Sequence, residues 1–276
     1  SVRSRNWFDL TWQTTAITLD YKITAGQRLN VKYFNIRGDR NSVGYFPSGG
    51  ITVPDDIDPV TGEYNNRTVD IDQYRNNGLE ARYLFSYQTG KLAHNLSAGL
   101  RLYEGDTFRY RGGKGTTGSD YDISILGEFT GDINYRSKNA ALFVENLFSI
   151  TEKFLVIPGF RYEYLKAEAG GYSGITTGGD PIYLQDQSRT RGFVLGGIGF
   201  EYAVSANTKL YANATQSYRP VQFADLTTPP TTDVIDPNLT DAKGLNIDFG
   251  YRGAVKDYLV YDVSIFYLDY QNRVGT

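Results

Sequence analysis

Short turns and long loops alternate along this chain, and this alternation restricts the fold more than any other feature of the sequence. The short turns lie near Gly26, Thr89, Lys153, Asn207 and Lys256. The long connections, rich in Gly, Asp, Asn and Pro, cover about 38–74, 106–120, 166–189 and 219–241. A soluble sandwich or propeller has no reason to gather every short turn at one end and every long loop at the other. A barrel that crosses a membrane does, because it has short turns at one rim and long loops at the opposite rim.

Between the connections, apolar and polar residues alternate with the period of two that marks a β-strand. Ile17, Leu19 and Tyr21 alternate with polar residues in the first such segment. In the segment FLVIPGFRYEYL, residues 154–165, Phe160 lies on one face of the predicted strand and Arg161 on the other. Burying Arg161 and Glu163, the two charged residues of this segment, in a dry core would cost several kcal/mol of desolvation. A water-filled lumen would keep both charges hydrated.

The composition excludes several classes of protein. The 276 residues include no Cys, so disulfides and Cys-ligated metals are ruled out. A net charge of -3 provides no global basic field for a nucleic acid. No window reaches the roughly 18 to 20 apolar residues of a membrane-spanning helix, but only alternate residues of a barrel strand need to be apolar. Because the sequence has no signal peptide and no Met, we expect it to be an internal piece of a longer protein.

We therefore predict an all-β fold, a transmembrane antiparallel β-barrel to which this chain contributes about ten strands. Parts of residues 122–134 are predicted to form an extra hairpin within one loop. Tyrosines near strand ends are typical of the aromatic girdles at the two membrane interfaces, although a high β-propensity of Tyr would also place them in strands. The girdle candidates are Tyr162, Tyr164, Tyr202, Tyr218, Tyr251, Tyr267 and Tyr270.

Four stretches resemble TonB-dependent outer-membrane receptors, and their order and spacing carry the resemblance. NAALFVENLFSITEKFLVIPGFRYEY, residues 139–164, is similar to the mid-barrel hairpin of that family. YANATQSYRPVQFADL, residues 211–226, resembles the strand that rises into a loop with an aromatic-Arg-Pro element. VIDPNLTDAKGLNIDFGYRG and VYDVSIFYLDYQNRVG resemble the strands that follow. The sequence stretches PVQFADL and VIDPNL most resemble the ferric-dicitrate, or FecA-like, receptors.

The resemblance implies a barrel of about 22 strands, filled by an N-terminal plug and energised through a TonB box. Residues 1–276 would be part of the barrel domain only, with plug, signal peptide and TonB box absent from the sequence and both sheet edges paired by further strands. The implied location is the bacterial outer membrane. The implied partners are a ferric chelate or other small ligand, the TonB complex acting through the plug, and outer-membrane lipid and lipopolysaccharide. No cofactor is implied.

Other motifs are weak candidates for chemistry. The stretch 112–117 lacks the spacing of a phosphate-binding loop, and Gly196, Gly197 and Gly199 are expected to relieve crowding in a strand. His94 is expected to be a solvated turn residue, since a lone His makes neither a metal site nor a catalytic dyad. The loop acids Asp55, Asp56, Asp58 and Glu63 lack the spacing of an EF-hand and are expected to be solvated. No set of nucleophile, base and orienting residue appears, so no enzyme is predicted.

The remaining candidates are polar and mostly cationic residues at the predicted outer mouth. Arg guanidinium groups match carboxylate oxygens in pairs, and ferric chelates of citrate are anionic and carry exposed carboxylates. The alternatives are that these charges are simply solvated, or that they pair with lipopolysaccharide phosphates. The candidate ligand-binding residues are Arg109, Arg111, Lys114, Arg189, Arg191, Arg219 and Gln222.

The sequence thus favours a receptor that imports a ferric chelate, ferric citrate or another siderophore, with TonB-derived energy. The first alternative is a TonB-dependent importer of a glycan or peptide. A passive porin or a surface adhesin is the second, and is less favoured because porins usually have one constricting loop rather than several long ones.

Overall fold

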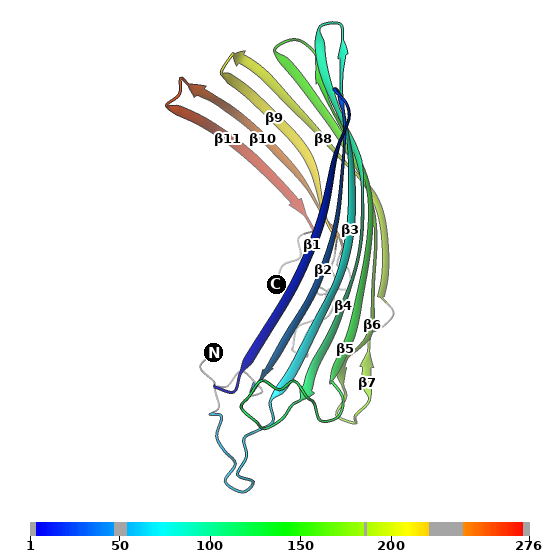
Figure 1. The fold of residues 1–276 in the computed structure, drawn as a ribbon, viewed down its shortest axis with the longest axis vertical. Helices are drawn as coiled ribbons and strands as arrows, with labels where there is room; N and C mark the ends of the chain where they lie inside the picture. The colour runs from blue at the N-terminus through cyan, green and yellow to red at the C-terminus, as the bar shows by residue number, and fades with distance from the viewer. Residues whose placement is uncertain (1–3, 47–53, 185–186, 221–239, 273–276) are drawn as a thin grey trace.

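The computed structural model describes residues 4–46, 54–184, 187–220 and 240–272, and shows a single antiparallel sheet that curves into an arc (Figure 1). Among the described residues, no helix is long and apolar enough to span a membrane. The strands are β1 (Trp7–Thr24), β2 (Gln27–Gly44), β3 (Thr68–Thr89), β4 (Leu92–Lys114), β5 (Gly131–Ser149), β6 (Phe154–Ile175), β7 (Pro181–Tyr183), β8 (Gln187–Ser205), β9 (Thr208–Arg219), β10 (Ala242–Val255) and β11 (Leu259–Gln271).

Each long strand pairs with its neighbours in sequence, so the order across the sheet is β1 to β6 and then β8 to β11. The three-residue β7 pairs only with β6, in the connection that follows it. In the part of the chain that the structure describes, the short turns lie at one end of the strands and the long connections at the other (Figure 1). The predicted organisation of about ten strands in hairpins with long loops at one rim is confirmed.

The two faces of the sheet differ as the alternation predicts. Phe160 is 59% exposed on the outward face, whereas the side chains of Arg161 and Glu163 are 32% and 14% exposed on the inward face. Side chains crowd on the inner face of a curved sheet and spread apart on the outer one, which accounts for the difference. The strands therefore present an apolar band to lipid and a polar wall to the lumen.

The strands continue well beyond this apolar band. Residues 68–74, which the sequence assigns to the first long connection, belong to β3, which begins at Thr68. β4 continues to Lys114, β6 continues to Ile175, and β8 begins at Gln187. Above the membrane, the outward positions become polar, so alternation of hydropathy no longer marks the strand. The hairpin predicted at 122–134 is wrong, since residues 122–130 are irregular and β5 begins at Gly131.

Aromatic rings lie flat against glycines on the inner face. Trp12 of β1 is directly opposite Gly38 of β2, and a Cβ on Gly38 would lie 2.6 Å from the Trp12 ring. Phe34 of β2 is opposite Gly78 of β3, and a Cβ on Gly78 would overlap its ring. Glycine in a strand lacks a side chain to pack, and the neighbouring ring covers the gap.

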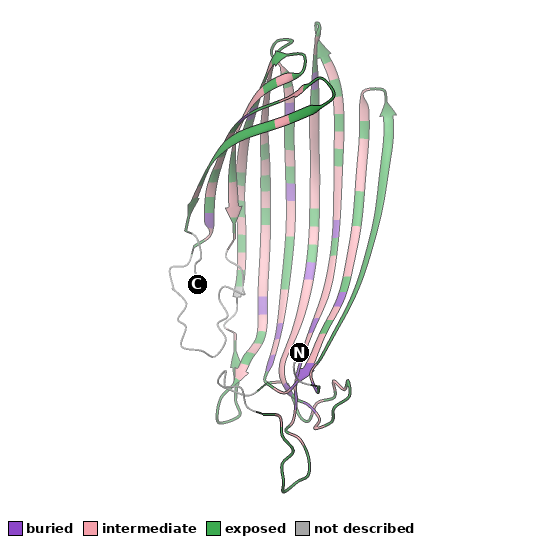
Figure 2. Ribbon diagram, turned by 90° about the vertical axis from the view of Figure 1, so that its left-hand side faces the viewer, coloured by how far each residue is buried: buried purple, intermediate pink, exposed green. Residues whose placement is uncertain are grey.

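The most completely buried side chains lie at the loop end, where two arginines tie the connections together (Figure 2). Arg5 donates to the carbonyl oxygens of Asn65, Thr117 and Gly118, and its Nη1 lies 2.6 Å from Asp55 Oδ1. Arg67 donates to the carbonyl oxygens of Thr116 and Asp120 and to the Thr116 hydroxyl. Both arginines are at most 2% exposed. We call this unit, formed by residues 4–6, 54–67 and 115–120, the loop latch.

His94 is not the solvated turn residue that the sequence predicts. It lies within β4, is 7% exposed, and its Nδ1 accepts a hydrogen bond of 3.1 Å from the Ser149 amide. Its ring packs between Tyr87 and Phe148. The short turn leaves the ends of β3, β4 and β5 side by side, and these aromatic side chains exclude water from the imidazole.

Candidate functional site

A hollow of about 470 Å³ opens on the inner face of the sheet. Along the strands, it lies at a level between that of the outward apolar band and that of the loops. Its floor is a cross-strand row of small side chains, Gly105, Ser137 and Ala167, on β4, β5 and β6. Larger residues form the walls. Asn76 on β3 is directly opposite Gly105 in the floor row. The rows above and below contribute Tyr74, Tyr103, Thr107, Arg109, Tyr135, Asn139, Leu165 and Arg191, and Pro220 also lines the hollow. The volume lies in the range of sites that hold small molecules.

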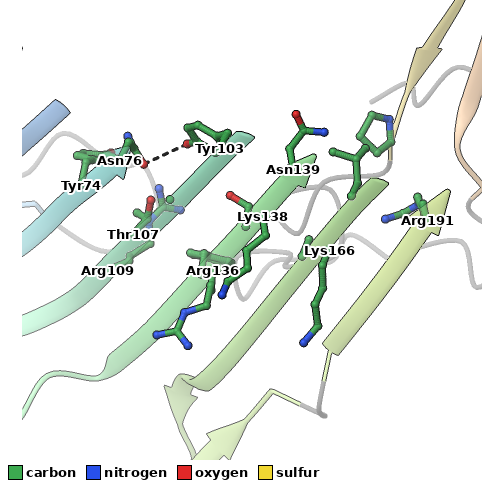
Figure 3. Close-up of a pocket in the computed structure, with 16 residues that line it drawn as sticks. Tyr74, Asn76, Tyr103, Thr107, Arg109, Arg136, Lys138, Asn139, Lys166 and Arg191 are labelled. Atoms are coloured by element: carbon green, nitrogen blue, oxygen red, sulfur yellow. Dashed lines mark hydrogen bonds between the residues drawn. The ribbon is translucent and has the colours of Figure 1, made fainter. Parts of the chain in front are cut away.

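Figure 3 shows how the lining residues divide between the two faces of the sheet. Tyr103 and Asn139 lie on the face opposite to Arg136 and Lys166, as strand alternation requires. The Tyr103 hydroxyl donates to Asn76 Oδ1 at 3.1 Å. Arg136, Lys138 and Lys166 therefore border the hollow through their backbone and extend their charges outward.

At the loop side of the hollow, three arginines converge on Asp72. Arg111 Nη2 lies 2.8 and 2.9 Å from the two Asp72 oxygens, and Arg109 Nε lies 3.1 Å from Oδ1. Arg40 Nη1 approaches Oδ2 at 3.3 Å. Asp72 is 1% exposed, so its carboxylate is enclosed while the guanidinium groups keep access to the lumen. One carboxylate compensates three cations, which leaves this region electropositive.

Sequence reasoning placed Arg109 and Arg111 near the mouth, and it missed Asp72 and Arg40. Arg109 is opposite Asp72 in the β3–β4 register, and Arg40 is opposite Asp72 in the β2–β3 register. The available signal was the alternating stretch TVDIDQ at 68–73, which reads as a strand once polar alternation is accepted in place of hydropathy. Burial is the largest single influence on the pKa of the Arg109 guanidinium and lowers it. The charge and the hydrogen bond of the Asp72 carboxylate, together with weaker contributions from nearby tyrosines, outweigh burial, so the pKa of Arg109 is raised.

Arg191 forms a second cationic point on the other side of the hollow. Its Nε donates to Asp241 Oδ2, which also accepts a hydrogen bond from the Tyr218 hydroxyl. Tyr218 lies beyond the apolar band at the end of β9 and packs its ring against Phe193, with 3.8 Å between ring centroids. Burial raises the pKa of Tyr218, and the hydrogen bond to Asp241 raises it further, so the hydroxyl stays protonated and keeps donating.

The other predicted residues are not gathered at the hollow. Lys114 is exposed at the end of β4, and Arg219 is exposed at the end of β9, opposite Ala242. Arg189 lies two residues from Arg191 on β8, next to Ala167 of the floor row, but it is not among the residues that line the hollow. Gln222 lies outside the described residues. Thus the structure brings Arg109 and Arg111 together, places Arg191 across the hollow, and leaves the remainder of the predicted set dispersed.

The acidic loop at 55–63 has structural roles. Asp55 is paired with Arg5 of the loop latch, so it is not solvated as predicted. Asp58 Oδ1 accepts the amide hydrogens of Val60 and Thr61 in a local turn. Glu63 lies 3.3 Å from the Thr117 hydroxyl. In the described part of the chain, no three acidic or His side chains converge as metal ligands would.

Comparison with known proteins identifies the family. The TonB dependent receptor-like β-barrel family matches residues 1–276, the whole chain. This chain belongs to that family. The receptor chain is therefore part of an outer-membrane β-barrel, in a family of receptors and transporters rather than enzymes. No curated protein matches it by sequence.

Solved structures resemble the receptor chain in fold. The ferric citrate transporter FecA in its unliganded form has a TM-score of 0.73 at 16% identity, and the match covers all of this chain and 37% of FecA. The ferric-catecholate import receptor Fiu from E. coli K12 has a TM-score of 0.70 at 18% identity, with 97% and 42% covered. The copper transporter OprC has a TM-score of 0.68 at 14% identity, with 94% and 39% covered. The receptor chain thus spans about two fifths of the length of these proteins.

Proposed function

We propose that this chain forms part of an energised outer-membrane receptor that imports an anionic ferric chelate, such as ferric citrate or another siderophore rich in carboxylates. The hollow supports this proposal most directly, because Arg109 and Arg191 border it from opposite sides. The Nε of Arg109 donates to Asp72, and the Nε of Arg191 donates to Asp241. Their terminal nitrogens have no acceptor within the described part of the chain and remain available to a carboxylate ligand.

The source of energy and the partners belong to the same proposal. The family match supports a TonB complex that acts through a plug, and the fold is shared with importers of ferric chelates. The outward face would contact outer-membrane lipid and lipopolysaccharide. These roles concern the whole receptor, of which this chain is one part.

A second candidate function is import of a glycan or peptide. Trp12 stacks on Tyr74 with ring centroids 5.2 Å apart, and Tyr74 also lines the hollow. Such a platform binds the apolar face of a sugar ring or an aromatic side chain without any need for anionic charge. The two functions therefore differ in which side chains carry the affinity.

A double substitution that removes the charges of two arginines distinguishes import of an anionic chelate from import of a glycan or peptide. In the whole receptor, Arg109→Gln combined with Arg191→Gln is expected to weaken ferric citrate binding at least tenfold, since each hydrogen bond to an ionised group contributes about 1.5–3 kcal/mol. Isothermal titration at two salt concentrations measures the effect. The fold should persist, because Asp72 keeps Arg40 and Arg111 while Asp241 keeps Tyr218.

Arg136→Gln is the matched control, since Arg136 borders the same hollow by its backbone while its side chain pairs outward with Asp106. It should leave ferric citrate binding unchanged. Wild-type affinity in the double variant would contradict the anionic-chelate proposal. If Trp12→Ala abolishes binding of a neutral oligosaccharide in the same titrations, the glycan importer gains support instead.

A further inference from the structure

Asp72 is a buried acid on the inner face, and three arginine side chains are ordered around it. It lies on β3 between Arg40 of β2 and Arg109 of β4, directly opposite each of them in the strand registers. Arg111, two residues further along β4, reaches the same carboxylate. Asp72 is 1% exposed and is not among the residues that line the hollow. It therefore has no free surface with which to contact an imported ligand.

The hydrogen-bonding capacity of the Asp72 carboxylate is used completely. It accepts four hydrogen bonds from the three guanidinium groups, at 2.8, 2.9, 3.1 and 3.3 Å. An ionised carboxylate offers about four lone-pair sites. A long arginine side chain otherwise samples many rotamers, and ordering it costs free energy when a ligand binds. Asp72 removes this cost, because it orders the guanidinium groups before a ligand arrives.

Of the three arginines around Asp72, only Arg109 lines the hollow. Its Nε donates to Asp72 at 3.1 Å, and its guanidinium carbon lies 5.7 Å from the centroid of the Tyr135 ring. Tyr135 is itself part of the wall of the hollow. The carboxylate and the ring together hold the Arg109 guanidinium at the edge of the hollow.

Sharing one carboxylate among three cations preserves the positive charge at this edge. A single pair of Asp72 with Arg109 would be neutral, and an anion would gain little from it. Here Arg40 and Arg111 also pair with Asp72, so the cluster keeps an excess of two positive charges. Arg40 and Arg111 thus offset the acid without lining the hollow.

We propose that Asp72 is the positioning residue of the anion site. It orients Arg109 at the hollow, while Arg40 and Arg111 compensate its negative charge. This role rests on the proposed import of an anionic chelate and deepens it, since Asp72 acts through Arg109 and not by contact with the ligand. Binding groups hold their geometry only when a second layer of hydrogen bonds fixes their rotamers.

The sign of one substitution tests this role. In the whole receptor, Asp72→Asn is expected to weaken ferric citrate binding on the order of tenfold, because Arg109 loses its fixed orientation and its contact with the ligand. Electrostatics alone predicts the opposite sign, since removal of a negative charge strengthens the attraction of an anion. Isothermal titration measures the affinity, and the loss should persist at high salt.

Arg40→Gln makes the opposite change of charge in the same cluster. Asp72 keeps its three hydrogen bonds from Arg109 and Arg111, so the orientation of Arg109 should persist. Ferric citrate binding should weaken about twofold to threefold at low salt and return to the wild-type value at high salt, where screening removes the effect of a distant charge. A loss that persists at high salt would overturn the division of roles between Asp72 and Arg40.

Asp39→Asn is the matched control. Asp39 lies one residue from Arg40 on the outward face and pairs with Arg75 at 3.2 Å, so the substitution makes the same chemical change at an ion pair away from the hollow. It should keep wild-type affinity for ferric citrate.

A second measurement needs no imported ligand. Phenylglyoxal condenses with accessible guanidinium groups, and mass spectrometry of the treated receptor gives the rate at each arginine. In Asp72→Asn, Arg109 and Arg111 should react severalfold faster than in the wild type. Arg191, held by Asp241 across the hollow, should keep its rate, whereas a general loss of structure would raise all three.

The outcomes separate the two proposals. Wild-type or tighter ferric citrate binding in Asp72→Asn, while Arg109→Gln with Arg191→Gln weakens it, would overturn the positioning role and leave the anionic chelate in place. Faster modification of Arg109 without any loss of ferric citrate binding in either variant would overturn the anionic chelate instead. Unchanged modification of Arg109 in Asp72→Asn would overturn the positioning role whatever the ligand.

Discussion

Arg67→Ala is expected to open the loop latch and to lower its local stability by about 2–4 kcal/mol, because each buried acceptor that loses its donor costs about 1–3 kcal/mol. The substitution leaves the Asp120 carbonyl and the Thr116 hydroxyl without their guanidinium donor and creates a cavity at a fully buried position, while the Thr116 carbonyl keeps the amide of residue 67. Hydrogen exchange of the whole receptor in micelles measures the change. Amides of residues 54–67 and 115–120 should exchange on the order of a hundredfold faster.

Arg75→Ala provides the comparison, because Arg75 lies on β3, which begins directly after Arg67, in a half-exposed pair with Asp39 and should contribute less than about 1 kcal/mol. The Gly115 amide is the most informative probe, since it donates to the Arg67 carbonyl at 2.7 Å. Unchanged protection of this amide in Arg67→Ala would show that the backbone contacts hold the loops without the guanidinium.

Phe160→Arg is expected to impair membrane insertion by about 2–4 kcal/mol, the cost of an Arg on the lipid face near the bilayer midplane. Phe160 is among the more exposed apolar side chains, and the outward row at its level is apolar, with Val144 on β5. Folding of the whole receptor into lipid vesicles, followed by denaturant titration, measures the difference.

Arg161→Ala, one residue along the same strand, is the control for face assignment. Its side chain pairs with Glu163 and lies over Phe143 on the wet inner face, so its loss should cost about 1 kcal/mol or less. Similar losses at Phe160 and Arg161 would mean that the two faces of β6 do not contact lipid and water as described.

The hairpins and faces were predictable from sequence because the membrane maintains an alternation of hydropathy in the lower half of each strand. Leu100 and Leu102 face lipid and Arg101 faces the lumen, as period two requires. The upper halves were not predictable in this way. There both faces are polar, so residues 68–74 were assigned to a loop although β3 begins at Thr68.

The same limit explains what was missed at the candidate site. Arg109 and Arg111 lie near an alternating segment and could be placed at the mouth. Asp72 is separated from them by nearly forty residues of sequence and fell in a stretch assigned to a loop, so its contacts depended on an unknown register. Arg5 and Arg67 gave no signal at all, because nothing in their neighbouring residues distinguishes a buried arginine from a solvated one.

The glycines beneath Trp12 and Phe34 also bear on how the strands find their alignment. An alternating pattern cannot detect a slip of two residues, because such a slip returns every side chain to the same face. A two-residue slip of β1 would place Trp12 against Ile36 or Arg40, and a slip of β2 would place Phe34 against Asn76 or Glu80. Each alternative forces a ring onto a side chain where the native pairing offers bare backbone. Discrimination between competing alignments during assembly therefore resides on the wet wall of the barrel, while the lipid-facing wall is indifferent to them.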